Sequence, residues 1–393
     1  MFYLNECAIV CALGDSHASI KARLLELAAS GVAPSDAWSA GRFLPLGRVD
    51  TALPPVAHLA PGQRSRNNAL ALAALAQIRP ALEAAVARYG ASRVGVVVGT
   101  STSGIAETES ALRQYVADAS LPRDYHHGQQ EMGSLAAMLA QELGLEGPAY
   151  VHSSACSSGA KAMASAARLI KMGLCDAVLT GAVDSLCAFT VAGFSALASV
   201  SAAPCNPLSL NRDGINIGEG AALFLMSAQP AAVALCGWGE SSDGHHMSAP
   251  DPAGGGARLA IAQALARAGV TAAQIDYINL HGTATPQNDA MESRVVAELF
   301  GAAVAVSSTK PFTGHTLGAA AAVEAGLCWL AMQDDNPDGR LPPHLWDGVP
   351  DPALPALNLV RPGMALGRPL RWALSNSFAF GGSNAVLLLG RPA

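Results

Sequence analysis

Three residues that are far apart in the sequence have side chains that could act together as one nucleophile and two hydrogen-bond donors. Cys156 lies in the turn SSACSSG, between an apolar stretch and an alanine-rich segment, so we expect its sulfur near a helix N-terminus. Unpaired N–H groups and the helix dipole at such an end favour a thiolate and could hold an oxyanion. His281 and His315 each follow an apolar stretch. An imidazole can activate a thiol, and neutral imidazoles can donate hydrogen bonds to an enolate oxygen.

The elements that must position these residues have the pattern of an α/β sheet. Val94–Gly99 is an all-apolar run, typical of a strand buried on both faces, and Ile275–Leu280 is a second apolar strand. The strongest helical pattern covers Asn67–Ala87, with a kink expected at Pro80. The carboxyl ends of parallel strands lie along one edge of a sheet, where ligands bind. We therefore expect the cysteine and the two histidines to converge at that edge.

The second half of the chain repeats the plan of the first. Tyr150–Gly173 and Val304–Met332 each have the pattern of a strand, a small-residue turn and a helix, at an offset of 159 residues. A second pair of glycine turns, each followed by a strand, has an offset of 164 residues. Such units also recur by chance in α/β proteins, but the two similar offsets favour an internal duplication.

Composition excludes several classes of protein. The 393 residues are 51% hydrophobic and 14% charged, with a formal net charge of −6, so the chain has material for a large core and is not disordered. There is no long basic run, which argues against a nucleic-acid partner. The eight cysteines are scattered without a CxxC pair, as in a reduced cytoplasmic protein.

We expect no targeting segment and no membrane anchor. The opening residues, MFYLNECAIVCALG, lack the basic start of a signal peptide. The nearest approach to a membrane span is Thr316–Met332, which is short of about 20 residues and contains Glu324. This segment is better explained as a buried helix of a cytoplasmic protein.

Five motifs, in order along the whole chain, resemble those of the β-ketoacyl-acyl carrier protein synthases, the elongating condensing enzymes of fatty-acid and polyketide synthesis. The motifs are SSACSSGAKAMASAARLI (153–170), RDGINIGEG (212–220), INLHGTATPQND (278–289), SSTKPFTGHTLGAAAAVE (307–324) and NSFAFGGSN (376–384). The resemblance implies the thiolase fold, an α/β protein with duplicated halves layered α-β-α-β-α. Residues 1–230 would carry the nucleophile and residues 231–393 both histidines, within one compact unit.

The resemblance also implies a reaction. Cys156 would take an acyl group from a carrier-protein thioester, and His281 and His315 would hold the thioester carbonyl of malonyl-acyl carrier protein. Their hydrogen bonds would stabilise the enolate that forms as CO₂ leaves. Attack of this enolate on the acyl-enzyme gives a 3-oxoacyl product two carbons longer. Lys310 matches a lysine that supports His315 and pairs with a glutamate matching Glu324.

Further residues gain expected roles in the same way. Thr283 and Thr285 match threonines that touch the pantetheine arm of the carrier. Phe378 and Phe380 lie in a loop that gates the acyl pocket, and the backbone N–H groups of Cys156 and Phe380 would form the oxyanion hole. No cofactor is implied beyond a structural monovalent cation. Its expected ligands, all of which could instead be ordinary buried polar groups, are Asn279, Glu324, Ser375 and Asn376.

The sequence departs from the family pattern at two positions. Ala379 replaces the first glycine of the gate loop, and because alanine has poor access to positive φ, we expect a stiffer gate. Ser209 stands where relatives often carry aspartate. Together these favour a specialised polyketide or polyene enzyme over a housekeeping one.

Three alternatives and a choice of partners remain. A thiolase-type acyltransferase needs a second cysteine in the C-terminal glycine loop, which has none here, and an initiating condensing enzyme has asparagine where this chain has His315. A chain-length factor lacks the nucleophile, so Cys156 argues against that role, although this chain could pair with such a subunit as a heterodimer or form a homodimer. Arg64, Arg66 and Arg212 could meet an acidic acyl carrier protein.

Overall fold

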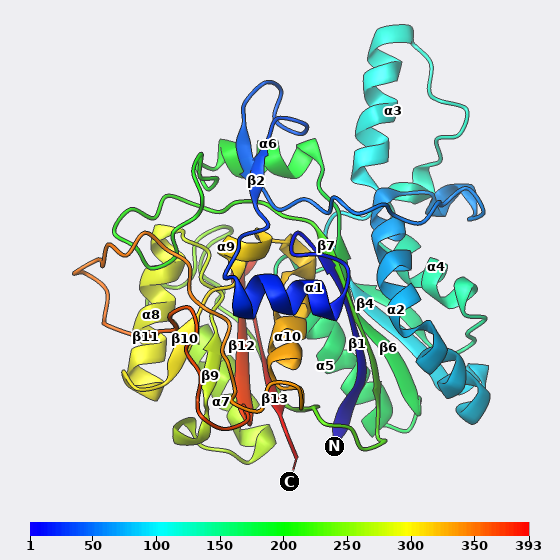
Figure 1. Ribbon diagram of the computed structural model, residues 1–393. Helices are drawn as coiled ribbons and strands as arrows, with labels where there is room; N and C mark the ends of the chain where they lie inside the picture. The colour runs from blue at the N-terminus through cyan, green and yellow to red at the C-terminus, as the bar shows by residue number, and fades with distance from the viewer. Residues whose placement is uncertain (393) are drawn as a thin grey trace.

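The computed structural model describes residues 1–392, and its main sheet contains two groups of strands of the same design (Figure 1). The first group consists of β1 (Phe2–Cys11), β4 (Val94–Gly99), β5 (Ala149–His152), β6 (Ala177–Asp184) and β7 (Gly220–Ser227). The second group consists of β8 (Ala234–Ser242), β9 (Tyr277–Asn279), β10 (Ala305–Ser307), β12 (Trp372–Ala379) and β13 (Ser383–Gly390). The spatial orders are β1-β7-β6-β4-β5 and β8-β13-β12-β9-β10. Strand order and direction are thus repeated, which confirms the internal duplication.

The two groups join into one 11-stranded sheet through a short contact between β1 and β8. This contact pairs Phe2 with Leu235 and Tyr3 with Ala234, in antiparallel register. The short strand β11 (Asn358–Leu359) extends the second group at its outer edge, parallel to β10. Residues that are distant in sequence are therefore positioned by one hydrogen-bonded frame.

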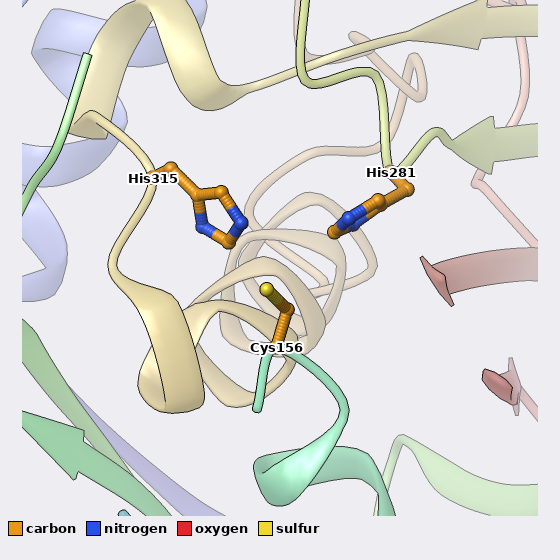
Figure 2. A group of neighbouring side chains, drawn as sticks. All are labelled: Cys156, His281 and His315. Carbon is orange, nitrogen blue, oxygen red and sulfur yellow. The ribbon is translucent and has the colours of Figure 1, made fainter. Parts of the chain in front are cut away.

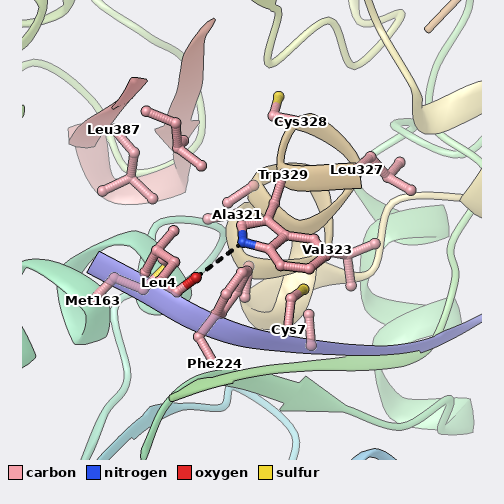
Figure 3. Close-up of a cluster of buried hydrophobic side chains, with 14 of the residues drawn as sticks. Leu4, Cys7, Met163, Phe224, Ala321, Val323, Leu327, Cys328, Trp329 and Leu387 are labelled. Carbon is pink, nitrogen blue, oxygen red and sulfur yellow. Dashed lines mark hydrogen bonds between the residues drawn. The ribbon is translucent and has the colours of Figure 1, made fainter. Parts of the chain in front are cut away.

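Two helices rich in small residues fill the space between the strand groups, as Figure 1 shows. They are α5 (Ser158–Lys171) and α10 (Ala320–Ala331), and they pack against each other and against strands of both groups. Their approach is close at Gly159, where a Cβ atom would lie 2.9 Å from the backbone nitrogen of Ala322. Deeper in this core, the indole N–H of Trp329 donates to the carbonyl of Leu4 at 3.1 Å (Figure 3).

Helices also cover the outer faces of the sheet. On the first group lie α2 (Arg66–Tyr89) and α4 (Ser134–Glu142), and on the second lie α7 (Gly255–Ala268) and α8 (Pro286–Phe300). Side chains alternate along the strands, because successive residues point to opposite faces. In β4, for example, Val97 belongs to the inner core and Val96 and Val98 to the outer one. The result is the expected α-β-α-β-α layering.

Helix α2 contains Pro80 in its interior and is continuous on both sides of it, so the expected kink does not end the helix. By length and composition it is also the one described helix that could cross a membrane, whereas Leu317–Ala331 is too short. Half of the apolar stretch of α2 is buried, and its buried residues pack on the first strand group, as those of a core helix do.

Several of the remaining elements were not expected from the sequence. The short helix α1 (His17–Lys21) is capped by Ser16, and α9 (Lys310–Thr313) precedes His315. The unexpected elements are the helices α3 (Ile105–Asp118) and α6 (Ala188–Ala196) and the small antiparallel pair β2 (Ala33–Ser35) and β3 (Leu44–Leu46). In Figure 1, α3 projects from the body and α6 lies above the central helices.

Candidate active site

The structure brings the cysteine and the two histidines together at the carboxyl ends of the strands. Cys156 follows β5, His281 follows β9, and His315 follows β10 and α9. The Cys156 sulfur and one ring nitrogen of each histidine lie within 4.8 Å of one another, and all three residues are buried. In Figure 2 the sulfur points to the space between the two rings, whose centroids are 5.5 Å apart. This is the geometry that a nucleophile and two donors around one thioester require.

The turn before α5 aims the cysteine side chain. Ala155 has a φ of +50°, a conformation that costs energy for a residue with a side chain and that persists where the surroundings impose it. The hydroxyl of Ser158 donates to the carbonyl of Ala155 at 2.6 Å and accepts from the N–H of Ser154 at 2.9 Å. These bonds tie the turn to the first residue of α5, so Cys156 is fixed just before the helix N-terminus.

The resting sulfur is a thiol rather than a thiolate. Burial raises the pKa of Cys156 to about 11, although the charge of Lys310 and the backbone N–H groups of Phe380 and of Cys156 itself oppose this effect. The expectation that the helix end yields a thiolate is therefore wrong for this conformation, because desolvation outweighs the local dipoles. The same N–H groups lie beside the sulfur, where an oxyanion hole would be.

Both imidazoles are neutral, and their hydrogen bonds place the ring proton on Nε2. The N–H of Leu317 donates to His315 Nδ1 at 3.2 Å, and the Lys310 ammonium lies 3.5 Å from His281 Nδ1. Burial and the charge of Lys310 hold the pKa of both histidines well below the usual value. Each ring therefore offers an Nε2–H to the site.

A cysteine and two histidines are also typical zinc ligands. In zinc sites the second ring nitrogen donates to a carboxylate or carbonyl, which leaves the first free to bind the metal. In this site the Nδ1 atoms of His281 and His315 accept hydrogen bonds instead. The arrangement thus favours two hydrogen-bond donors over two metal ligands.

Lys310 and Glu324 form a buried ion pair behind the histidines. Burial raises the pKa of Glu324 to about 7, and the neighbouring Lys310 opposes that shift. The resemblance assigned Lys310 to the support of His315, but its ammonium is within hydrogen-bond distance of His281 and acts on His315 through its charge. Glu292, which the sequence analysis missed, accepts the backbone N–H groups of His281 and Gly282 at 2.8 and 2.7 Å.

The three residues open into a cavity of about 340 Å³. Thr283 and Thr285 line one part, with their hydroxyl oxygens 2.9 Å apart. Phe378 and Phe380 line another, and the ring centroid of Phe380 lies 5.5 Å from that of Phe194 on α6. The sequence analysis did not identify Phe194, since helix α6 itself was not expected. Of the described residues that line the cavity, Asp213 is the one with a carboxyl side chain, and none is a lysine or arginine.

The gate loop does not show the strain expected of Ala379. Its φ is −86°, which alanine adopts without cost, so our reason for a stiffer gate is wrong in this conformation. The left-handed positions are taken instead by Gly381 and Gly382, with φ of +81° and +71°. These two glycines allow the chain to turn between β12 and β13 beside the sulfur.

The four residues of the expected cation site share an unusual property. Each has a buried side-chain oxygen that no described residue hydrogen-bonds, and these oxygens are Asn279 Oδ1, Glu324 Oε2, Ser375 Oγ and Asn376 Oδ1. The amide nitrogens of the two asparagines donate elsewhere, to Thr309 and Glu292. Buried oxygens without donors are costly, and oxygen ligands suit hard cations. The residues present therefore fit a small hard cation.

The arginines that could meet a carrier protein are engaged within the chain. Arg66 pairs with the buried Glu219, and Arg212 pairs with Asp351 at 2.6 Å. Arg64 donates to the carbonyl of Leu59 at 2.8 Å. These internal partners argue against Arg66 and Arg212 as a free docking surface.

Comparison with protein families and relatives gives a consistent result. Residues 35–231 match the β-ketoacyl synthase N-terminal domain, and residues 232–345 match the β-ketoacyl synthase C-terminal domain. The chain is 36% identical over 310 residues to nodulation protein E of Rhizobium meliloti (strain 1021), which covers 76% of this chain and 75% of the relative. It is 31% identical over 316 residues to 3-oxoacyl-[acyl-carrier-protein] synthase 2 of Staphylococcus aureus, with 76% and 77% covered.

Solved structures agree in fold over the whole chain. The ketosynthase ApeO, solved in complex with its chain length factor ApeC from Xenorhabdus doucetiae, superposes with a TM-score of 0.94 at 44% identity, covering 100% of this chain and 98% of that one. A β-ketoacyl synthase from Burkholderia phymatum STM815 gives a TM-score of 0.87 at 28% identity, with 100% and 99% covered. With its motifs, its duplicated layered fold and these relatives, the chain belongs to the β-ketoacyl synthase family.

Proposed function

We propose that this protein is a 3-oxoacyl-[acyl-carrier-protein] synthase that condenses an acyl group held on Cys156 with malonyl-acyl carrier protein. The observation that carries the proposal is the convergence of one buried thiol with two neutral imidazoles in a single cavity. The proposed catalytic residues are Cys156, His281 and His315, with Lys310 and Glu324 behind them.

In the first step, Cys156 attacks the carbonyl of an acyl-carrier thioester. The Nε2 atoms of His281 and His315 both hold protons, so neither Nε2 atom can accept the proton of the thiol. The proton leaves with the carrier thiolate, so the step forms one thioester and one free carrier thiol. The backbone N–H groups of Cys156 and Phe380 stabilise the tetrahedral oxyanion.

In the second step, the malonyl thioester carbonyl accepts the two Nε2–H groups. The bond to the carboxylate carbon breaks, CO₂ leaves, and the electron pair becomes an enolate that the imidazoles stabilise. The cavity lining offers no lysine or arginine to the malonyl carboxylate, so its donors favour the enolate over the anionic substrate. The enolate carbon attacks the acyl-cysteine, and the released sulfur takes up a proton from solvent.

A condensation assay with two variants tests these roles. The protein with acyl- and malonyl-carrier thioesters should release CO₂ and give a 3-oxoacyl-carrier product two carbons longer. In His315→Ala, which removes the donor, the CO₂ release should fall about 10²- to 10³-fold while acylation of Cys156 persists, because the donor acts in the second step. Product formation by Cys156→Ala would contradict the proposal. Condensation without CO₂ loss would favour the thiolase-type alternative.

A chain-length-factor subunit is the proposed partner beside the acyl carrier protein. Two similar ketosynthases at 44% and 26% identity, ApeO and the ishigamide ketosynthase, were solved with a chain length factor. We place this chain in the same kind of heterodimer, in polyketide or polyene synthesis, with a homodimer as the alternative. Condensation by the protein alone at the same rate as with a co-expressed chain-length factor would favour the homodimer.

The unpartnered oxygens support a structural monovalent cation held by Asn279, Glu324, Ser375 and Asn376. The thermal midpoint should be higher in Na⁺ or K⁺ than in choline buffer of equal ionic strength. This difference should shrink in Ser375→Ala, which removes one oxygen. An equal midpoint in all three salts would contradict the cation site.

We also place the protein in the cytoplasm, as one cooperative unit made of residues 1–230 and 231–393. All eight cysteines are free, as in a reducing compartment. The two halves share the core around α5 and α10, which supports a single folding unit.

A further inference from the structure

The turn between β12 and β13 is tied to the helix that follows the nucleophile. Ser383, the first residue after the turn, accepts a hydrogen bond from the Lys161 ammonium at 2.6 Å. Its hydroxyl also lies 3.0 Å from that of Ser157, the residue next to Cys156. Lys161 is the fourth residue of α5. The contact therefore joins two residues that are 222 positions apart in the sequence.

The tied turn contains the backbone donor that faces the sulfur. The Phe380 N–H opposes the rise in the pKa of Cys156, and Phe380 lines the same cavity as Cys156, three residues before Ser383. On its other side the turn is held by backbone bonds from Gly381 N–H to Met247 and from Asp243 N–H to Gly382, both at 2.9 Å, and the neighbouring Asn384 amide donates to the Asp243 carboxylate at 2.7 Å. The Lys161–Ser383 bond is therefore the charged link between this turn and the nucleophile's own helix.

Lys161 has no ion-pair partner among the described residues, although its side chain is half-buried. Lys310 and Lys21, in contrast, pair with Glu324 and Asp335. Burying an ammonium without a counter-ion is costly. If Lys161 had only a structural role, a neutral side chain would therefore serve as well. The donated hydrogen bond to Ser383 is the interaction that the charge strengthens.

We propose that Lys161 is a positioning residue for the condensation. Through Ser383 it holds the Phe380 turn against the N-terminus of α5, so that the Phe380 N–H stays at the place where the oxyanion forms. This role rests on the proposed function of the same site. Lys161 touches no substrate, and its effect on catalysis passes through the turn.

Kinetics of matched lysine variants test the role. Lys161→Met should lower kcat about tenfold, with KM for both carrier substrates changed by less than about twofold, because a displaced donor weakens transition-state binding. Lys161→Arg keeps the charge and should restore most of kcat. Lys171→Met, at the exposed end of the same helix, is the control and should match wild type. Ser383→Ala should behave as Lys161→Met does, and the double variant should be no slower than the slower single variant.

A second measurement does not depend on condensation. The alkylation rate of Cys156 by iodoacetamide, followed on its own peptide by mass, reports its pKa. The other groups facing the sulfur, Lys310, His281, His315 and Glu324, are unchanged in these variants. Loss of the Phe380 N–H should move the alkylation midpoint upward by about half a pH unit or more.

The outcomes separate the two proposals. If wild type makes no 3-oxoacyl product, the proposed function fails, and the alkylation profile still decides whether Lys161 acts on the sulfur. If Lys161→Met has the kcat and the alkylation profile of Lys171→Met, the positioning role is wrong. Should Lys161→Met misfold, Ser383→Ala gives the same comparison, and a wild-type profile in that variant overturns the proposal.

Discussion

At the scale of single residues, the site works by controlling where protons lie. The Nδ1 atoms of His281 and His315 receive hydrogen bonds, and burial with the charge of Lys310 keeps both rings neutral. The thiol of Cys156 is neutral as well, since burial raises its pKa to about 11. The nucleophile and both donors thus enter the reaction uncharged, and charge develops only where the N–H groups are aimed.

The tautomers and charge states can be measured directly. In ¹⁵N spectra of histidine-labelled protein at pH 6.5, His281 and His315 should both be neutral with the proton on Nε2. A protonated ring, or a proton on Nδ1, would contradict the account.

The pKa values of His281 and His315 are lower in the folded chain than in the unfolded one. The contribution of these two histidines to stability is therefore present above about pH 6.5 and is lost as the pH falls through the folded pKa.

At the scale of elements, the site depends on how closely α5 approaches α10. The contact requires glycine at position 159, because a Cβ there would meet the backbone nitrogen of Ala322 at 2.9 Å. The N-terminus of α5 also orients Cys156, and through Lys161 it orients the turn between β12 and β13. A shift of this helix therefore moves the nucleophile and the oxyanion donor together.

Replacing Gly159 with alanine should show this dependence. We expect Gly159→Ala to lose about 1–3 kcal/mol of unfolding free energy through overpacking, and to acylate more slowly. The exposed Gly193 of α6 has open space around its Cβ position, so Gly193→Ala is the control and should be neutral or stabilising. Denaturant unfolding and acylation rates give both quantities. Equal stability of the two variants would show that the helices separate without cost.

The elements also show what the sequence could predict. Short apolar strands followed by a reactive residue were recognisable, so β4 and the convergence of Cys156 with the two histidines were predicted. Helix α3 was missed: its apolar residues Leu112, Tyr115 and Val116 share one face but are exposed, and Ala111 is the one residue that it buries in the core. The Lys161–Ser383 bond and the high pKa of Cys156 depend on packing between distant segments and on burial, which no local pattern contains.

At the scale of the whole molecule, two similar halves are joined by one short strand contact and one large shared core. The β1–β8 pairing involves two residue pairs, whereas the core around α5 and α10 takes residues from both strand groups. The stabilisation from the hydrophobic effect scales with the buried apolar area. This shared core therefore contributes most of the free energy that holds the two halves together. Neither half would retain its inner layer alone.

The protein should therefore unfold in one transition. Four of the five tryptophans, including Trp329, lie in the second half, whereas circular dichroism reports on helices of both halves. Thermal midpoints from tryptophan fluorescence and from circular dichroism should coincide. Two separated midpoints would show that the halves are independent domains.

The central claim is that Cys156 carries the growing acyl chain, and intact-mass analysis after incubation with acyl-carrier thioesters tests it most directly. Wild type should gain the mass of one acyl group, which maps to Cys156 and disappears when malonyl-carrier thioester is added. Cys156→Ala should gain nothing. Acyl mass on another residue, or full loading of Cys156→Ala, would contradict the account.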